Sequence, residues 1–258
     1  MTSPRDAIDR FLRRYLLAVR HYTRLPVAGL LANWVGETPE MLRASAPHLP
    51  GVGWLVGMAA CVVLAAVSVV LPNVALAPFA AAAVSTIATV LLTGAMHEES
   101  LGRFVDANQA DSAGGRAGTI AIVLVLALKL ALIATLAARS PGAVLTALLA
   151  GHTVSRFWPL TLALALAPSQ SSELPRPLQR RALAVSAVWC VVPLALMGLA
   201  LGIKFALAGA AASGLALVVL RGRLRSRTST ASADALGAAQ QVCEVAFYFG
   251  SALVVGGR

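Results

Sequence analysis

Long apolar runs separated by short polar segments dominate the pattern of this chain. Seven segments are long enough, or nearly so, to cross the hydrocarbon core of a bilayer as helices: 52–71, 75–95, 117–137, 142–167, 182–201, 203–220 and 235–255. The fourth contains Arg156 and Pro159, so we expect a kink or a partly aqueous lining there. The pattern predicts an all-α, polytopic transmembrane helix bundle that forms a single integral membrane domain over residues 1–258.

The segment before the first apolar run has an amphipathic pattern instead. Arginines lie mostly on one side of a helix over residues 6–22. The opposite face of that helix gathers Ile8, Phe11, Leu12, Tyr15, Leu16 and Val19. This distribution is typical of an N-terminal amphipathic helix at the membrane surface, attracted to anionic headgroups. An ordinary lead-in to the first spanning helix explains it equally well.

Composition excludes an ordinary soluble domain. Hydrophobic residues make up 58% of the 258 positions, charged residues only 12%, and the mean hydropathy is +0.78. The net charge of +10 comes from arginines at the ends of apolar runs, without a basic stripe of interleaved aromatics. The charge therefore indicates orientation in a bilayer, and nucleic acid is not expected as a partner. The three cysteines lie in apolar stretches and indicate core residues, not a metal site.

Charge also predicts the topology. If seven spans alternate, residues 1–50 and the segments 96–116, 168–181 and 221–234 all fall on one side. Three of these four carry an excess of arginine, so the positive-inside rule makes this side cytoplasmic, N-terminus included. We therefore expect a cytoplasmic or interfacial segment over 1–50, and cytoplasmic polar loops over 96–116 and 221–234.

Acidic residues are scarce, and four of them lie in the 96–116 segment: Glu98, Glu99, Asp106 and Asp111. Like charges gathered at a membrane surface favour a compensating cation. A small cluster of oxygen ligands suits magnesium, which typically takes one or two carboxylates and shares itself with substrate phosphates. A solvated polar loop is the alternative.

Two further features could carry chemistry. The glycine-rich run DSAGGRAG (111–118) leads into the third span, where backbone N–H groups can approach an anion. Inside the spans lie Lys129, Arg156 and Glu244, which are costly in a bilayer unless they face the bundle interior or a cavity. They indicate a functional site, or a structural ion pair such as Arg156 with Glu244.

Six motifs in order give the chain a family resemblance. They are YTRLPV (22–27), MLRASAPHLPGVGWLVG (41–57), TGAMHEES (93–100), DSAGGRAG (111–118), VSRF (154–157) and LGAAQQVCEVAFY (236–248). Over nearly its whole length the chain resembles the cobalamin synthase family, the adenosylcobinamide-GDP ribazoletransferases.

The resemblance implies a reaction of cobalamin (vitamin B12) nucleotide-loop assembly at the cytoplasmic face of a bacterial inner membrane. The adenosylcobinamide phosphate group of adenosylcobinamide-GDP passes to α-ribazole or its 5′-phosphate, and GMP is released, with Mg²⁺ as cofactor. Phosphoryl transfer of this kind depends mostly on positioning and neutralisation of charge. The oligomeric state, including a homo-oligomer, is left open.

Candidate site residues follow from combining the resemblance with the polar positions. The expected metal ligands are Glu99, Asp106 and Asp111, with Glu98 in reserve. The other candidates are Arg116, Arg156 and Arg24 for phosphate, Asp234 and Glu244 as a second carboxylate pair, and His97, Ser112 and Gly115 as matched motif positions.

The chain departs from the family pattern His-x-Asp-Gly-x-x-Asp-x-x-Asp-Gly, because it reads HEESLGRFVDA over 97–107. Arg103 stands at the second aspartate, and Ala113 stands at an arginine of the next motif. Arg103 either points away, contacts substrate phosphate, or weakens the metal site. Two alternatives follow: a paralogue that binds corrinoid or a partner enzyme without turnover, and a small membrane transporter.

Overall fold

The computed structural model describes residues 3–108, 116–165, 167–168, 180–225 and 230–255. Its helices are α1 (Pro4–Tyr22), α2 (Gly29–Val35), α3 (Pro39–Ser45), α4 (Leu49–Val70), α5 (Ala77–Thr93), α6 (Met96–Ala107), α7 (Arg116–Arg139), α8 (Pro141–Ala165), α9 (Arg180–Leu201), α10 (Ile203–Arg225) and α11 (Ala233–Val254), with a 3₁₀ turn η1 (Ala46–His48). Two-residue strands β1 (Ala167–Pro168) and β2 (Thr230–Ala231) pair in parallel. The all-α expectation is confirmed, and each predicted apolar segment matches one helix.

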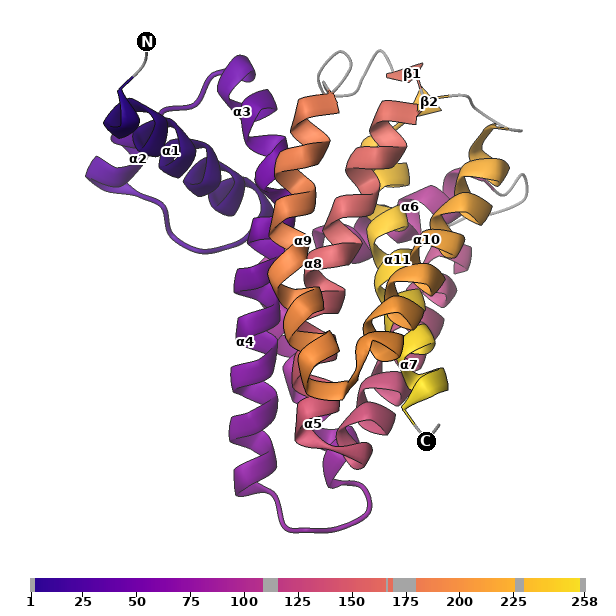
Figure 1. The fold of residues 1–258 in the computed structure, drawn as a ribbon. Helices are drawn as coiled ribbons and strands as arrows, with labels where there is room; N and C mark the ends of the chain where they lie inside the picture. Colours follow the sequence, from indigo (N-terminus) through magenta and orange to yellow (C-terminus); the bar gives the residue numbers. More distant parts are fainter. Residues whose placement is uncertain (1–2, 109–115, 166, 169–179, 226–229, 256–258) are drawn as a thin grey trace.

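The helices run between two ends of the bundle (Figure 1). The N-terminal helices, α6 and both strands lie at one end, whereas the α4–α5 turn and the last turn of α11 lie at the opposite end. The described parts of the arginine-rich segments, in α1–α3, at the start of α9 and at the end of α10, therefore share one end, as the alternation of spans predicts.

The number of membrane spans is supported only in part. Four stretches among the described residues are long and apolar enough to cross a membrane: Pro39–Val70, Arg116–Arg139, Arg181–Leu201 and Ile203–Leu224. Helices α5 and α6, bent by 85° at their junction, would together make a fifth. Helices α8 and α11 are not in this set, and both carry buried polar groups, among them Arg156 and Glu244. A helix shielded by its neighbours does not need an apolar surface all round.

The 96–116 segment, expected to be a loop, contains helix α6. Gly94 and Ala95 both have left-handed φ angles, of 65° and 57°, and they turn the chain sharply after α5. The charged residues of α6 share it with a buried face that includes His97 and Leu101. The expectation of a loop was wrong because the charged residues of α6 made the apolar periodicity of its buried face hard to recognise. The second expected loop, 221–234, likewise begins inside α10, which extends to Arg225.

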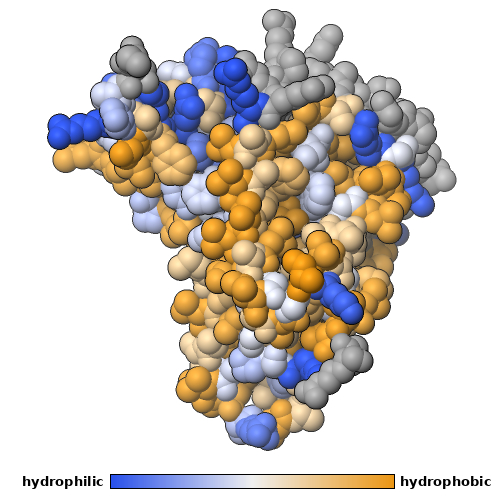
Figure 2. Space-filling model, in the orientation of Figure 1, coloured by the Kyte–Doolittle hydropathy of each residue, from blue (hydrophilic) through white to orange (hydrophobic). Residues whose placement is uncertain are grey.

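Helix α1 is a separate amphipathic helix and not the beginning of α4. Ser3 and Asp6 form a capping box at its start. Its second half buries Leu17, Ala18 and Val19, and the Tyr15 hydroxyl donates to the Gly51 carbonyl at 3.2 Å. The N-terminal helices therefore pack beside the top of the bundle (Figure 1), where the space-filling view shows apolar surface continuing down the spans (Figure 2).

Close backbone contact fixes α4 against α8. A Cβ at Gly53 would overlap the carbonyl oxygen of His152, and one at Gly57 would lie 3.0 Å from the Cα of Leu149. Small residues four apart allow helices in a membrane to approach in this way. Helix α8 continues through Pro159 and holds Arg156 in the interior, with 2% of that residue exposed. These contacts set the position of the polar residues of α8.

Candidate active site

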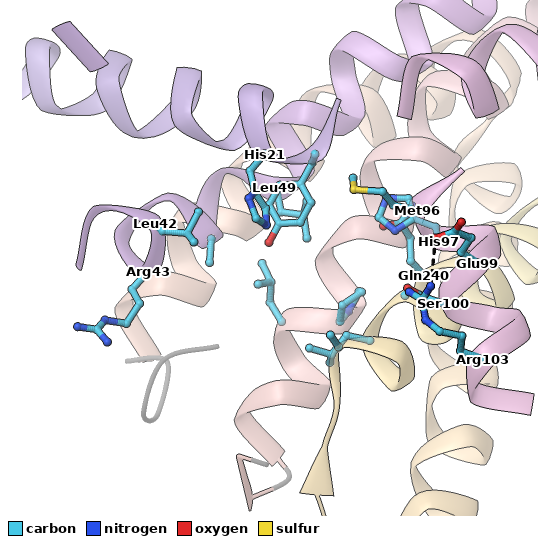
Figure 3. Close-up of a pocket in the computed structure, with 17 residues that line it drawn as sticks. His21, Leu42, Arg43, Leu49, Met96, His97, Glu99, Ser100, Arg103 and Gln240 are labelled. Carbon is cyan, nitrogen blue, oxygen red and sulfur yellow. Dashed lines mark hydrogen bonds and ion pairs between the residues drawn. The ribbon is translucent and has the colours of Figure 1, made fainter. Parts of the chain in front are cut away.

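A pocket of about 400 Å³ lies at the arginine-rich end of the bundle. One wall comes from the N-terminal segment, with His21, Leu42 and Leu49, and the opposite wall comes from α6 and α11 (Figure 3). Pro159 and Leu160 of α8 also line it. Segments far apart in the sequence thus meet around a single cavity.

The polar groups of the pocket are concentrated on the α6 side. Helix α6 contributes His97, Glu99, Ser100 and Arg103, and α11 contributes Gln240 (Figure 3). On the opposite wall the guanidinium of Arg43 is directed away from α6, and it pairs with Glu40 at 3.1 Å. The cavity therefore has one polar and one mostly apolar wall.

Two polar side chains lining the pocket each have one buried nitrogen without a partner. His97 is 7% exposed and Gln240 is 1% exposed. Neither the Nε2 atom of His97 nor that of Gln240 has a hydrogen-bond partner among the described residues. An unsatisfied buried polar group costs about 1–3 kcal/mol. Both atoms are closed off from solvent in this structure, so a ligand in the pocket reaches them only when neighbouring side chains move.

Arg103 connects α6 to α11 at the rim of the pocket. Its Nε donates to Asp234 Oδ1 at 2.9 Å, and its Nη1 donates to Glu99 Oε2 at 3.1 Å. Its side chain lines the cavity, so Arg103 does not point away from the pocket. Asp234, a predicted catalytic carboxylate, is held at the first turn of α11 by this contact.

The Asp106 carboxylate stabilises the start of α7. Its Oδ1 accepts a hydrogen bond from the backbone N–H of Gly118 at 2.8 Å. A Cβ at position 118 would overlap Asp106 Oδ2 and the Gly102 carbonyl oxygen, so only glycine allows this approach of α6 and α7. A carboxylate at a helix N-terminus is favourable because it meets unpaired N–H groups and the positive end of the helix dipole.

Glu99, Asp106 and Asp111 were expected to hold magnesium together. Asp111 lies outside the described residues, as do Ser112 and Gly115. Within the described part of the chain, no three acidic, histidine or cysteine side chains are grouped as metal ligands. Glu99 is engaged by Arg103, and Asp106 by Gly118. As they stand, these residues do not fit a resident ion.

A buried ionic cluster lies in the bundle interior. Glu244 contacts Lys129 Nζ at 2.6 Å, His152 Nδ1 at 3.3 Å and the Tyr248 hydroxyl at 3.2 Å. The ion pair suggested between Arg156 and Glu244 is thus made by Lys129, because the guanidinium of Arg156 turns back to the His152 carbonyl at 2.8 Å. Arg156 and Glu244 do not line the pocket.

The remaining candidates lie at the edges of this region. Glu98, the reserve ligand, is buried and accepts a hydrogen bond from Gln241 at 2.8 Å. Arg24 is exposed and packs against Gly94 at the α5–α6 turn. Arg116 is exposed at the first residue of α7. Neither arginine lines the pocket.

Sequence reasoning did not identify Ser100 and Gln240 as site residues. Ser100 meets α11 at Gly237, where a Cβ would overlap its side chain. The signal that could have found Gln240 is its polarity inside an apolar span, since polar residues within spans usually face the bundle interior.

Comparisons with known proteins cover nearly the whole chain. A family model described as cobalamin-5-phosphate synthase matches residues 14–252. The chain is 42% identical to the adenosylcobinamide-GDP ribazoletransferase of a Polaromonas species, over 96% of this chain and 99% of the relative. It is 41% identical to that of Polaromonas naphthalenivorans, over 95% and 99%, and 32% identical to that of Ralstonia nicotianae, over 93% and 94%. No solved structure matches. These matches confirm the resemblance of the six motifs, and the chain belongs to the cobalamin-5-phosphate synthase family.

Proposed function

We propose that the pocket between the N-terminal segment and α6, α8 and α11 is where this chain carries out the reaction of its family. The chain is an adenosylcobinamide-GDP ribazoletransferase of cobalamin nucleotide-loop assembly. The observation that carries the location is the convergence of His97, Ser100, Arg103 and Gln240 on one cavity. We expect adenosylcobinamide-GDP and α-ribazole, or its 5′-phosphate, as the substrates.

The polar wall suits the pyrophosphate of adenosylcobinamide-GDP. Arg103 brings a guanidinium to the rim, where it now pairs with Glu99 and Asp234, and Ser100 adds a hydroxyl donor on the same helix. Arginine donors match phosphate oxygens in geometry and charge. In this arrangement the wall holds the phosphorus so that a ribose hydroxyl can approach it, and positioning of this kind supplies much of the catalysis of phosphoryl transfer.

The two buried Nε2 atoms suit the proton and oxygen chemistry of the step. His97 Nε2, when unprotonated, can accept the proton of the attacking ribose hydroxyl, and Gln240 Nε2 can donate to an oxygen of the phosphoryl group. The hydroxyl oxygen forms the new bond to phosphorus, and the bond from that phosphorus to GMP breaks.

The apolar wall suits the ring systems of the substrates. Leu42, Ala46, Leu49, Leu160 and Leu236 line the cavity, and Ala46, Leu49 and Leu160 pack together in one buried cluster. Burying apolar ligand surface against such side chains contributes about 25 cal/mol per Å². A ligand with a charged phosphate and a large apolar part would therefore use both walls.

We also propose a divalent cation, a cytoplasmic orientation and supporting roles for the remaining candidate residues. A divalent ion would neutralise charge on the pyrophosphate when bound, and Glu99 and Asp106 with Asp111 are its proposed ligands, once Arg103 has moved. Arg24, Arg116 and Arg156 are proposed to add positive potential near the phosphates. Seven spans in a bacterial inner membrane, with the pocket at the cytoplasmic face, agree with the shared end of the arginine-rich segments. A homo-oligomer is compatible with this arrangement.

The test is turnover by the purified full chain in lipid nanodiscs with adenosylcobinamide-GDP, α-ribazole and Mg²⁺. GMP and the coupled corrinoid, measured by liquid chromatography and mass spectrometry, should form together and require both substrates. His97→Asn should lower kcat about 100-fold or more, whereas Lys204→Met, at an exposed position in the first turn of α10, is the control. Unchanged turnover in both His97→Asn and Gln240→Leu would place the reaction elsewhere. Corrinoid binding without GMP would instead support the non-catalytic paralogue.

A further inference from the structure

Helices α1 and α2 form an arm that projects sideways from the arginine-rich end of the bundle (Figure 1). Much of its apolar surface is exposed. On α2, Leu30 is 89% exposed, and on α1, Ile8 is 60% exposed; Phe11, Leu12 and Leu31 are exposed as well. A single exposed apolar side chain is common on a protein surface, but five on one short arm indicate a surface that something apolar covers.

A cluster of aromatic rings sets the depth of the arm relative to the spans. Tyr15 and Phe11 of α1 both stack on Trp189 of α9, with ring centroids 5.4 Å and 5.9 Å apart. Trp54 of α4 meets the Trp189 ring edge-on, and its Nε1 donates to the Trp189 carbonyl at 2.8 Å. Tryptophan and tyrosine gather where the hydrocarbon core of a bilayer meets water. Because α4 and α9 both belong to candidate spans, the cluster holds α1 at the level of the lipid headgroups.

The arginines of α1 complement an anionic surface. Arg10 and Arg14 lie one turn apart and are exposed, and neither forms an ion pair with the described residues. Arg13 differs, because it pairs with Asp9 on the same helix at 2.9 Å. Helical periodicity places Arg10 and Arg14 on the side of α1 opposite Leu12. Figure 2 accordingly shows hydrophilic residues mostly along the outer side of the arm and hydrophobic residues mostly along the side toward the spans.

We propose that the α1–α2 arm docks on the bilayer leaflet at this end of the bundle and binds anionic phospholipid headgroups. Ile8, Leu12 and Leu30 enter the boundary between headgroups and acyl chains, while Arg10 and Arg14 pair with lipid phosphates. A bilayer fits this arm better than a protein partner does, because the apolar surface continues from the arm onto the spans, which lipid covers (Figure 2).

Docking of the arm also bears on the pocket. Helix α1 ends at Tyr22, and both His21 and Tyr22 line that cavity. A lipid surface that holds the arm therefore holds one wall of the cavity. The docking itself does not depend on the proposed function, because it rests on the arm and the spans alone.

The experiment measures hydrogen–deuterium exchange of the full chain, without substrate, in two kinds of nanodisc. One contains phosphatidylcholine alone, and the other contains about 30% phosphatidylglycerol, an anionic lipid. Each basic residue near an anionic surface strengthens the attraction roughly fivefold. The amides of residues 8–14 should therefore exchange about tenfold or more slowly in the anionic discs, and high salt should remove most of this difference.

Paired variants separate docking from general electrostatics. The double variant Arg10→Gln with Arg14→Gln should lose the dependence on phosphatidylglycerol. Arg139→Gln with Lys204→Gln removes the same charge at the opposite end of the bundle and should keep it. Leu30→Gln tests the apolar contact: it should speed exchange over residues 29–35 in both discs, whereas a side chain that faces water would tolerate the change.

Equal exchange of the arm in the two kinds of disc would overturn the proposal and leave protein packing as the only support of α1. A difference that both double variants lose would also overturn it, because the effect would then follow net charge. Protection that appears only when two chains share a disc would assign the surface to a second copy instead. Thermal midpoints in detergent should be unchanged, since every substituted side chain is exposed. Turnover does not enter these measurements, so this proposal and the proposed function can fail separately.

Discussion

The buried ion pair of Lys129 and Glu244 should contribute several kcal/mol to the free energy of unfolding when one partner is removed. Its two charged atoms lie 2.6 Å apart, with 3% and 1% of the side chains exposed. At an effective dielectric of about 20, their attraction is roughly 6 kcal/mol, and desolvation of each ion offsets much of it. Lys129→Met leaves the Glu244 carboxylate buried without its cation, so we expect a loss of about 3–5 kcal/mol in the free energy of unfolding.

The assay is thermal unfolding in detergent micelles, followed by tryptophan fluorescence. For a chain of this size, that loss lowers the midpoint by on the order of 10 °C. Lys204→Met, at the only other lysine of the sequence and exposed, should change the midpoint little. The double variant Lys129→Met with Glu244→Gln removes both charges, so its loss should be smaller than the sum of the single losses by about 1–3 kcal/mol. Strictly additive losses would show that Lys129 and Glu244 do not stabilise each other in the folded chain.

Three further predictions follow from the packing and the pocket. Gly53→Ala should lower the free energy of unfolding by about 1–3 kcal/mol, because the added Cβ meets the α8 backbone. Gly142→Ala, with open space around position 142, should leave the free energy of unfolding unchanged. The thermal midpoints of the two variants test this difference. Asp106→Asn should lower the free energy of unfolding by about 0.3–1 kcal/mol, because the negative charge at the α7 N-terminus is lost. A loss of Mn²⁺ binding free energy larger than this would instead assign Asp106 to the metal. Gln240→Ala should reduce kcat about tenfold or more with little change in midpoint, and a midpoint shift without a kinetic change would contradict a ligand-contact role.

The sequence predicted the helices well because apolar length determines where a chain can cross a bilayer. The segment expected at 117–137 is α7, Arg116–Arg139, and that at 235–255 is α11, Ala233–Val254. It did not predict α6, because periodicity is hard to recognise where four of the first eight residues are His97, Glu98, Glu99 and Arg103. The left-handed turn at Gly94 and Ala95, on which its direction depends, has no strong sequence signal.

The candidate site was predictable as a set of chemical groups but not as a geometry. Polarity and motif order identified His97 and Glu99, both of which line the pocket. The sequence could not show which charges pair. Arg103 pairs with Asp234, and Lys129 pairs with Glu244, each across more than 100 residues of the chain. Such pairings depend on how the helices pack in three dimensions, and a one-dimensional pattern contains no distances.

The position of Glu244 on the last helix has a consequence for biosynthesis. Lys129 leaves the ribosome roughly 115 residues before Glu244, which at about 5–20 residues per second is about 6–23 s. During that interval the bundle has its lysine without the carboxylate that neutralises it. A nascent chain that stalls or ends before α11 therefore retains a buried lysine without its carboxylate partner, which destabilises the packing around α7.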